Sequence, residues 1–116
     1  MAAVVLLAEP DSVWLKPAAG TGEIVELITR TRFSIDSDNA YGTGVCGRAF
    51  RTQKPCVNED ILDSVQGTPW QQIGRETGVV ACVAVPLIKA GASVGVLMFF
   101  VSKSWAMDEE IGRAHV

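Results

Sequence analysis

Two long apolar segments in the C-terminal half of the chain give its clearest structural signal. Residues 79–87 and 93–101 are rich in Val, Leu, Met and Phe, and a short Gly-containing segment joins them, which predicts an antiparallel pair of strands. Alternation along the second segment places Gly95, Leu97 and Phe99 on one face. The other face carries Val94, Val96, Met98 and Phe100. Because both faces are apolar, we expect a central strand that is covered on both sides.

The N-terminal part of the chain predicts further strands. Residues 3–8 form a continuous apolar run, and residues 13–18 follow after a turn-forming Glu-Pro-Asp-Ser segment, so the two predict a β-hairpin. Residues 31–35 alternate between polar and apolar and predict another strand. Residues 23–29 fit either a short helix or a strand.

Short helices are expected between the strands. Residues 44–52 place apolar side chains at helical spacing with Arg48 and Arg51 facing outward, and a proline follows that ends the helix. Residues 56–58 predict a brief strand, and residues 69–77 a second helix that opens with Pro and stops before Gly. We therefore expect an α+β domain, with an antiparallel sheet of five to six strands and short helices over one face.

Composition and charge narrow the function classes. The chain has 116 residues, of which 48% are hydrophobic and 20% charged, which suits one domain with a packed core. Its net charge of −3 and lack of a basic stripe argue against nucleic-acid binding. No apolar stretch is long enough to span a membrane, so we expect no membrane contact by this segment. Three cysteines at irregular spacing do not form a disulfide framework, which favours a reduced, cytoplasmic protein.

A series of motifs in residues 41–100 carries a family resemblance. In order they are Y-G-T-G-V-C-G-R-A-F, E-D-I, P-W, V-A-V-P-L and S-V-G-V-L-M-F-F. Their order and spacing resemble the core of a GAF domain, a PAS-related sensory module, and above all the GAF domains of cyclic di-GMP turnover proteins and sensor kinases. The resemblance implies a GAF-like central antiparallel sheet and a regulatory, non-enzymatic domain that senses an unknown small-molecule ligand, without a cofactor. It also implies an output domain in cis (a diguanylate cyclase, phosphodiesterase or histidine kinase) in a bacterial signal-transduction protein whose full-length parent is a homodimer.

The resemblance also suggests where a ligand would bind. Asp60 matches the Asp of an N-D-F motif in related signalling domains, with Glu and Ile61 as its neighbours here, and Trp70 matches the Trp of their P-W-H motif, here followed by Gln. An acidic group and an indole beside one concave surface suit a small polar or cationic ligand. The expected ligand-binding residues are Tyr41, Phe50, Asp60, Ile61, Trp70, Ile73, Met98 and Phe100. The alternative is structural, with Asp60 capping a turn and the aromatic residues filling the core, and the departures from both motifs leave the ligand's identity open.

Cys46 supports an enzymatic alternative. Its G-V-C-G segment is similar to one in the free methionine-(R)-sulfoxide reductases, GAF-fold enzymes with a cysteine nucleophile. Those enzymes also carry a G-H-I-A-C-D-like loop, whereas residues 63–72 here contain neither Cys nor His, and Cys82 is expected to pack inside a strand. The plainer interpretation treats all three cysteines as small core residues. A single His and no C-x-x-C give metal, haem or bilin binding no support, and a purely structural dimerisation domain with a filled cavity is a third alternative.

The ends of the chain carry their own expectations. We expect residues 1–109 to be the core of the domain and residues 110–116 to be a non-native tail, because E-I-G-R-A-H-V matches the translation of a common sequencing-library adapter. The chain would then be a metagenomic fragment. The long helices that flank the core in the resembling domains would be missing from it.

Overall fold

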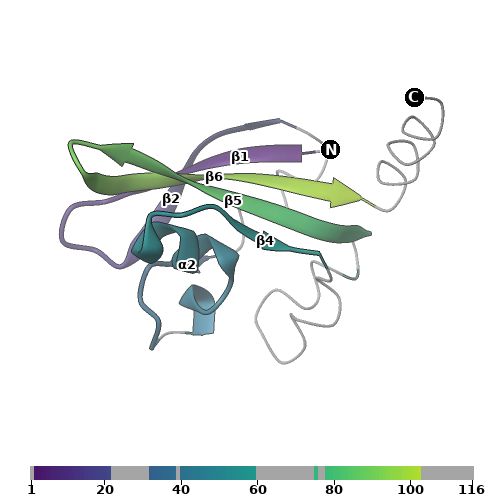
Figure 1. The fold of residues 1–116 in the computed structure, drawn as a ribbon, viewed down its shortest axis with the longest axis horizontal. Coiled ribbons are helices and arrows are strands. Elements are labelled where there is room, and N and C mark those ends of the chain that lie inside the picture. Colours follow the sequence, from purple (N-terminus) through teal and green to yellow (C-terminus); the bar gives the residue numbers. More distant parts are fainter. Residues whose placement is uncertain (1, 22–31, 39, 60–74, 76–77, 103–116) are drawn as a thin grey trace.

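The computed structural model of the chain describes residues 2–21, 32–38, 40–59, 75 and 78–102 (Figure 1). Along the chain the elements are β1 (Ala2–Ala8), β2 (Trp14–Thr21), β3 (Phe33–Ser34), the 3-10 helix η1 (Ala40–Gly42), α2 (Val45–Thr52), β4 (Cys56–Asn58), β5 (Val79–Lys89) and β6 (Ala92–Ser102). The expected α+β class and six-stranded sheet are confirmed. The segments expected at 23–29 and 69–77 lie outside the described residues, save for Arg75.

The six strands form one antiparallel sheet in the order β3-β2-β1-β6-β5-β4. The predicted N-terminal hairpin, β1–β2, joins the C-terminal hairpin, β5–β6, through pairing of β1 with β6. Those two long C-terminal strands cross the middle of the molecule in Figure 1. They are joined by a two-residue turn in which Ala90 has φ 53° and Gly91 φ 81°, the left-handed geometry that favours glycine in a tight hairpin.

Prolines mark where pairing stops on both sides of the sheet. In the described residues, β3 pairs with β2 only at Trp14 and Leu15, and Pro17 follows two residues later. β4 pairs with residues 82–84 of β5, and Pro86 lies just beyond. Because proline has no N–H to donate to a ladder, it is tolerated where a strand has no partner on that side. Of the strand predicted at 31–35, the structure shows Phe33–Ser34 as β3, and residue 31 lies outside the described residues.

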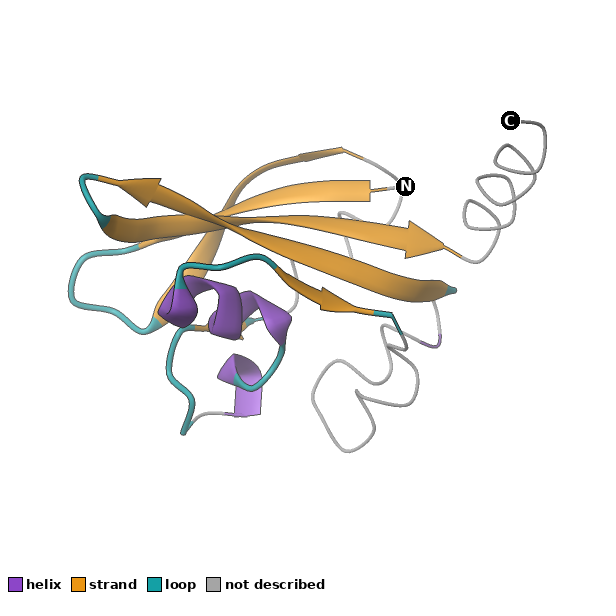
Figure 2. Cartoon of the chain, in the orientation of Figure 1, coloured by secondary structure: helices purple, strands orange, loops and turns teal. Residues whose placement is uncertain are grey.

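The two faces of the sheet are buried to different degrees. The inner face is the one that α2 covers (Figure 2), and the side chains at its centre are almost fully buried, including Leu6 on β1 and Val96 on β6, each at 0% exposed. The outer face carries Val5, Leu97 and Phe99, which are only partly buried. β6 is a central strand of the sheet, as expected, and its inner face is more deeply buried than its outer one. Alternation along a strand tells which side chains share a face but not what lies over it.

Helix α2 begins and ends close to where the sequence predicts. Gly44 precedes its first turn in an extended conformation, and Gln53 ends it in a left-handed conformation with its N–H donating to Ala49 O. Arg48 is exposed as expected. Arg51 is exposed as well, and its guanidinium also donates hydrogen bonds to two backbone carbonyls of the preceding loop, which the sequence did not predict.

Candidate ligand-binding site

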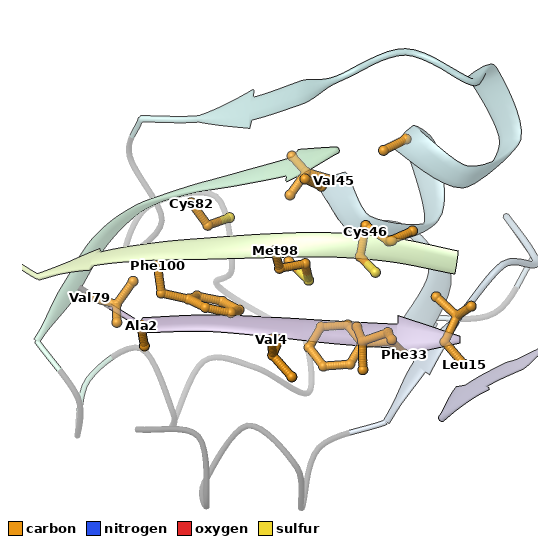
Figure 3. Close-up of a cluster of buried hydrophobic side chains, with 14 residues drawn as sticks. Ala2, Val4, Leu15, Phe33, Val45, Cys46, Val79, Cys82, Met98 and Phe100 are labelled. Atoms are coloured by element: carbon orange, nitrogen blue, oxygen red, sulfur yellow. The ribbon is translucent and has the colours of Figure 1, made fainter. Parts of the chain in front are cut away.

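The inner faces of β5 and β6 form an apolar wall. Met98 and Phe100 lie on β6, 2% and 9% exposed, and face Ala84 and Cys82 on β5 across the antiparallel register. Figure 3 shows these β6 side chains on the same side of the sheet as Cys82 and Val79. The strands place two of the sequence-predicted site residues side by side because both occupy even-numbered positions of one strand.

Helix α2 packs over part of the same face. Its buried stripe of Val45, Cys46 and Ala49 is at helical spacing and contributes to the core cluster that also contains Met98. Phe50, the third predicted site residue on this side, is partly buried and packs against the cluster. The structure therefore brings Phe50, Met98 and Phe100 into one apolar assembly, which fits both a ligand-facing wall and an ordinary core.

The cysteine thiols of this assembly are held in their neutral form. Burial, and secondarily the nearby Cys82, raises the pKa of Cys46 far above its ordinary value. Burial likewise raises the pKa of Cys82 to about 12. Cys56, by contrast, is half-buried with its Sγ 3.6 Å from Lys54 O. Because the thiolate is the nucleophile, neither buried cysteine is activated in this arrangement.

Tyr41 lies outside the apolar assembly. It stands in η1, and its ring makes an edge-on contact with Trp14 of β2, with ring centroids 5.7 Å apart and planes at 69°. The guanidinium of Arg32 lies over the Trp14 ring, 4.6 Å from its centroid. Sequence reasoning did not single out Trp14 or Arg32, since neither belongs to a recognisable motif and only the fold brings them to Tyr41.

The remaining predicted site residues, Asp60, Ile61, Trp70 and Ile73, lie outside the described residues. Within the described ranges no group of three or more His, Cys, Asp or Glu side chains is arranged to hold a metal ion. None of the helices in those ranges is long and apolar enough to cross a membrane.

Comparison with known proteins identifies the fold family. A family model described as "GAF domain" matches residues 2–113. The free methionine-R-sulfoxide reductase of Neisseria meningitidis, solved with its substrate, is 25% identical with a TM-score of 0.60, and the match covers 85% of this chain but only 50% of that one. No curated protein gives a significant match.

Two further solved structures are similar in fold. A Staphylococcus aureus NreA protein, mutated in its nitrate binding site, is 19% identical with a TM-score of 0.63, covering 88% of this chain and 72% of that one. A GAF domain/HD domain protein from Geobacter sulfurreducens is 15% identical with a TM-score of 0.66, covering 89% of this chain and 63% of that one. The chain thus spans half of the reductase, and about two thirds of the GAF/HD protein.

Proposed function

Because the chain belongs to the GAF domain family, as the match over residues 2–113 shows, we propose that it is the ligand-sensing module of a bacterial signal-transduction protein. Family membership supports a ligand-binding regulatory role, and that membership is the observation that carries the proposal. The ligand would lie against the inner face of β5 and β6, near Met98 and Phe100, with Asp60 and Trp70 supplying polar and aromatic contacts. An apolar wall with few polar groups is typical of small-molecule sites.

The proposed mechanism is a shift between two conformations of the domain. A ligand that prefers one conformation stabilises it by its difference in affinity for the two, commonly about 1–3 kcal/mol in such couplings. We propose that this preference passes to an output domain in the same chain, such as a diguanylate cyclase, phosphodiesterase or histidine kinase, in a cytoplasmic homodimeric parent.

A ligand screen by thermal shift tests this proposal. The panel holds nitrate, free methionine-R-sulfoxide, cyclic di-GMP, cyclic mononucleotides and the amino acids. A true ligand at one hundred times its Kd stabilises the folded state by about 2.7 kcal/mol, enough to raise Tm by several degrees. Asp60→Asn and Trp70→Phe should weaken that shift, whereas Asp38→Asn, which changes an exposed carboxyl of another loop, should not. No shift with any compound would favour a structural dimerisation domain with a filled cavity.

A second candidate is a free methionine-(R)-sulfoxide reductase that uses Cys46. The Neisseria structure, itself such a reductase, favours it, together with the G-V-C-G segment. The chemistry needs a thiolate that attacks the sulfoxide sulfur to release methionine, leaving a sulfenic acid that a second thiol converts to a disulfide and water. The 2% exposure of Cys46 and its raised pKa weigh against this role. Turnover of free methionine-R-sulfoxide with dithiothreitol, lost in Cys46→Ser but kept in Cys56→Ser, would establish the enzyme over the sensor.

A further inference from the structure

One side chain of helix α2 joins the two ends of the loop that leads into it. Arg51 Nη1 donates one hydrogen bond to Ile35 O at 3.1 Å and another to Gly42 O at 2.9 Å. Residues 35–42, the Arg51-closed loop, run from the end of β3 to the end of η1. Because the donor is a charged guanidinium, these bonds are stronger than those between neutral groups.

The backbone of this region also lies close to the helix. A Cβ added at Gly47 would lie 2.6 Å from Gly42 O and 2.7 Å from Ser34 O, closer than real Cβ contacts. A Cβ added at Gly42 would collide with Asp36 O. Side chains therefore cannot interdigitate where the loop crosses the helix. The hydrogen bonds from Arg51 hold the crossing together at that point.

Tyr41 is the loop residue that these constraints position. The carbonyl of the next residue, Gly42, is bound by Arg51, while the Tyr41 ring is held edge-on by Trp14. Trp14 is itself covered by the guanidinium of Arg32. The backbone and the ring of Tyr41 are thus each fixed by a different residue, from α2 on one side and from β2 on the other.

We propose that Arg51 is a positioning residue, which closes the 35–42 loop and thereby fixes the ring of Tyr41 against Trp14. Tyr41 is the only tyrosine of the chain, and a ring held in one orientation is pre-organised for contact with a ligand. The positioning itself needs no ligand. The positioning role of Arg51 can therefore be disproved while the proposed sensory function stands, and the sensory function can be disproved while the positioning role stands.

Fluorine NMR of protein labelled with 3-fluorotyrosine tests the proposal, because the single tyrosine gives a signal from one site. Wild-type protein should show a resonance displaced from that of the free amino acid by the neighbouring indole, and Trp14→Leu defines the shift without that indole. Arg51→Met should move the resonance in the direction of the Trp14→Leu position. Arg51→Lys, which keeps a charged donor, should restore part of the displacement. Arg48→Met removes an exposed arginine of the same helix and should leave the resonance unchanged.

Hydrogen exchange on the same variants separates a local effect from general loosening. Arg51→Met should raise exchange in peptides covering residues 35–43 by about ten-fold, the effect of losing roughly 1.4 kcal/mol of local protection. Peptides covering residues 94–101 should exchange as in wild type. An unmoved fluorine resonance in Arg51→Met, or an equal response in Arg48→Met, would overturn the proposal. If Arg51→Met does not fold, the same comparison is made with Arg51→Lys. A rise in hydrogen exchange of Arg51→Lys that is as large in peptides 94–101 as in peptides 35–43 would contradict the positioning role.

Discussion

The three cysteines of the chain differ in how deeply the fold buries their thiols. Cys46 on α2 and Cys82 on β5 are 2% and 5% exposed in the core cluster, whereas Cys56 at the start of β4 is half-buried. The sequence indicated that all three act as small core residues. Cys46 and Cys82 are buried in the core cluster, and Cys56 is partly buried and packs against it. Only the fold separates the two buried thiols from the half-buried one.

Thiol labelling should follow this difference. With the native protein at pH 8, Cys56 should react with iodoacetamide first, while Cys46 and Cys82 should wait for opening of the fold, because they are both buried and neutral. Peptide mass spectrometry after timed quenching measures the order. Cys56→Ser should abolish the rapid phase, and rapid labelling of Cys46 would contradict the structure and favour the reductase.

The same two thiols should make stability fall at alkaline pH. Their pKa values lie above the ordinary value of 9.0 in the folded state, so above about pH 9 the unfolded chain loses thiol protons that the folded chain keeps. The free energy of unfolding should therefore be unaffected by these groups below pH 8 and fall by up to about 1.4 kcal/mol per pH unit for each thiol above pH 9. Urea unfolding of wild type and Cys82→Ala between pH 7 and 10.5 measures the difference in slope. Equal slopes would show that Cys82 titrates alike in both states.

At the scale of elements, helix α2 combines local and long-range determinants. Its end was predictable, since Pro55 stops it two residues after the left-handed Gln53. The contacts that attach the helix to the sheet could not be predicted from the sequence. Ser93 Oγ donates to Phe50 O at 2.7 Å and Gln53 Nε2 to Gly91 O at 2.9 Å, which fasten the C-terminal end of the helix to the β5–β6 turn. These partners come from segments distant in sequence.

Gly47 gives a test of how closely α2 meets the preceding loop. In an isolated helix, Gly→Ala gains about 1 kcal/mol. Here the new methyl would meet two backbone carbonyls, Gly42 O and Ser34 O, which must shift. We expect Gly47→Ala to lower the free energy of unfolding by roughly 1–2 kcal/mol net, as overpacking does. Arg48→Ala, on the exposed side of the helix, serves as the control in the same urea melts and should stay within about 0.5 kcal/mol of wild type; a stabilised Gly47→Ala would contradict the close crossing.

For the whole molecule, the organising feature is a single sheet with unequal faces. The register places Val4 opposite Met98 on the inner face and Val5 opposite Leu97 on the outer face. Val4 is 1% exposed, while Val5 is only partly buried. The same residue type at adjacent positions of β1 therefore occupies two environments.

Alanine substitutions at Val4 and Val5 compare the two faces by their loss in the free energy of unfolding. Val4→Ala should cost about 2–3 kcal/mol, from lost burial plus the cavity that remains, whereas Val5→Ala should cost about 1 kcal/mol or less. Chemical denaturation with a shared m-value gives both numbers. Equal costs would mean that the outer face is as closely packed in solution as the inner one.

The sequence by itself determined the class of the fold and the approximate positions of most described strands and of helix α2, because alternation, helical spacing, prolines and turn glycines act over a few residues. The family followed from the order and spacing of the motifs in residues 41–100. The sequence also placed Met98 and Phe100 on one face, since that needs only a strand's period of two. The tertiary structure alone decided which face α2 covers, that Arg51 turns back onto the loop, and that Tyr41 meets Trp14. Those outcomes depend on contacts between segments far apart in the chain, whose energies no local pattern records.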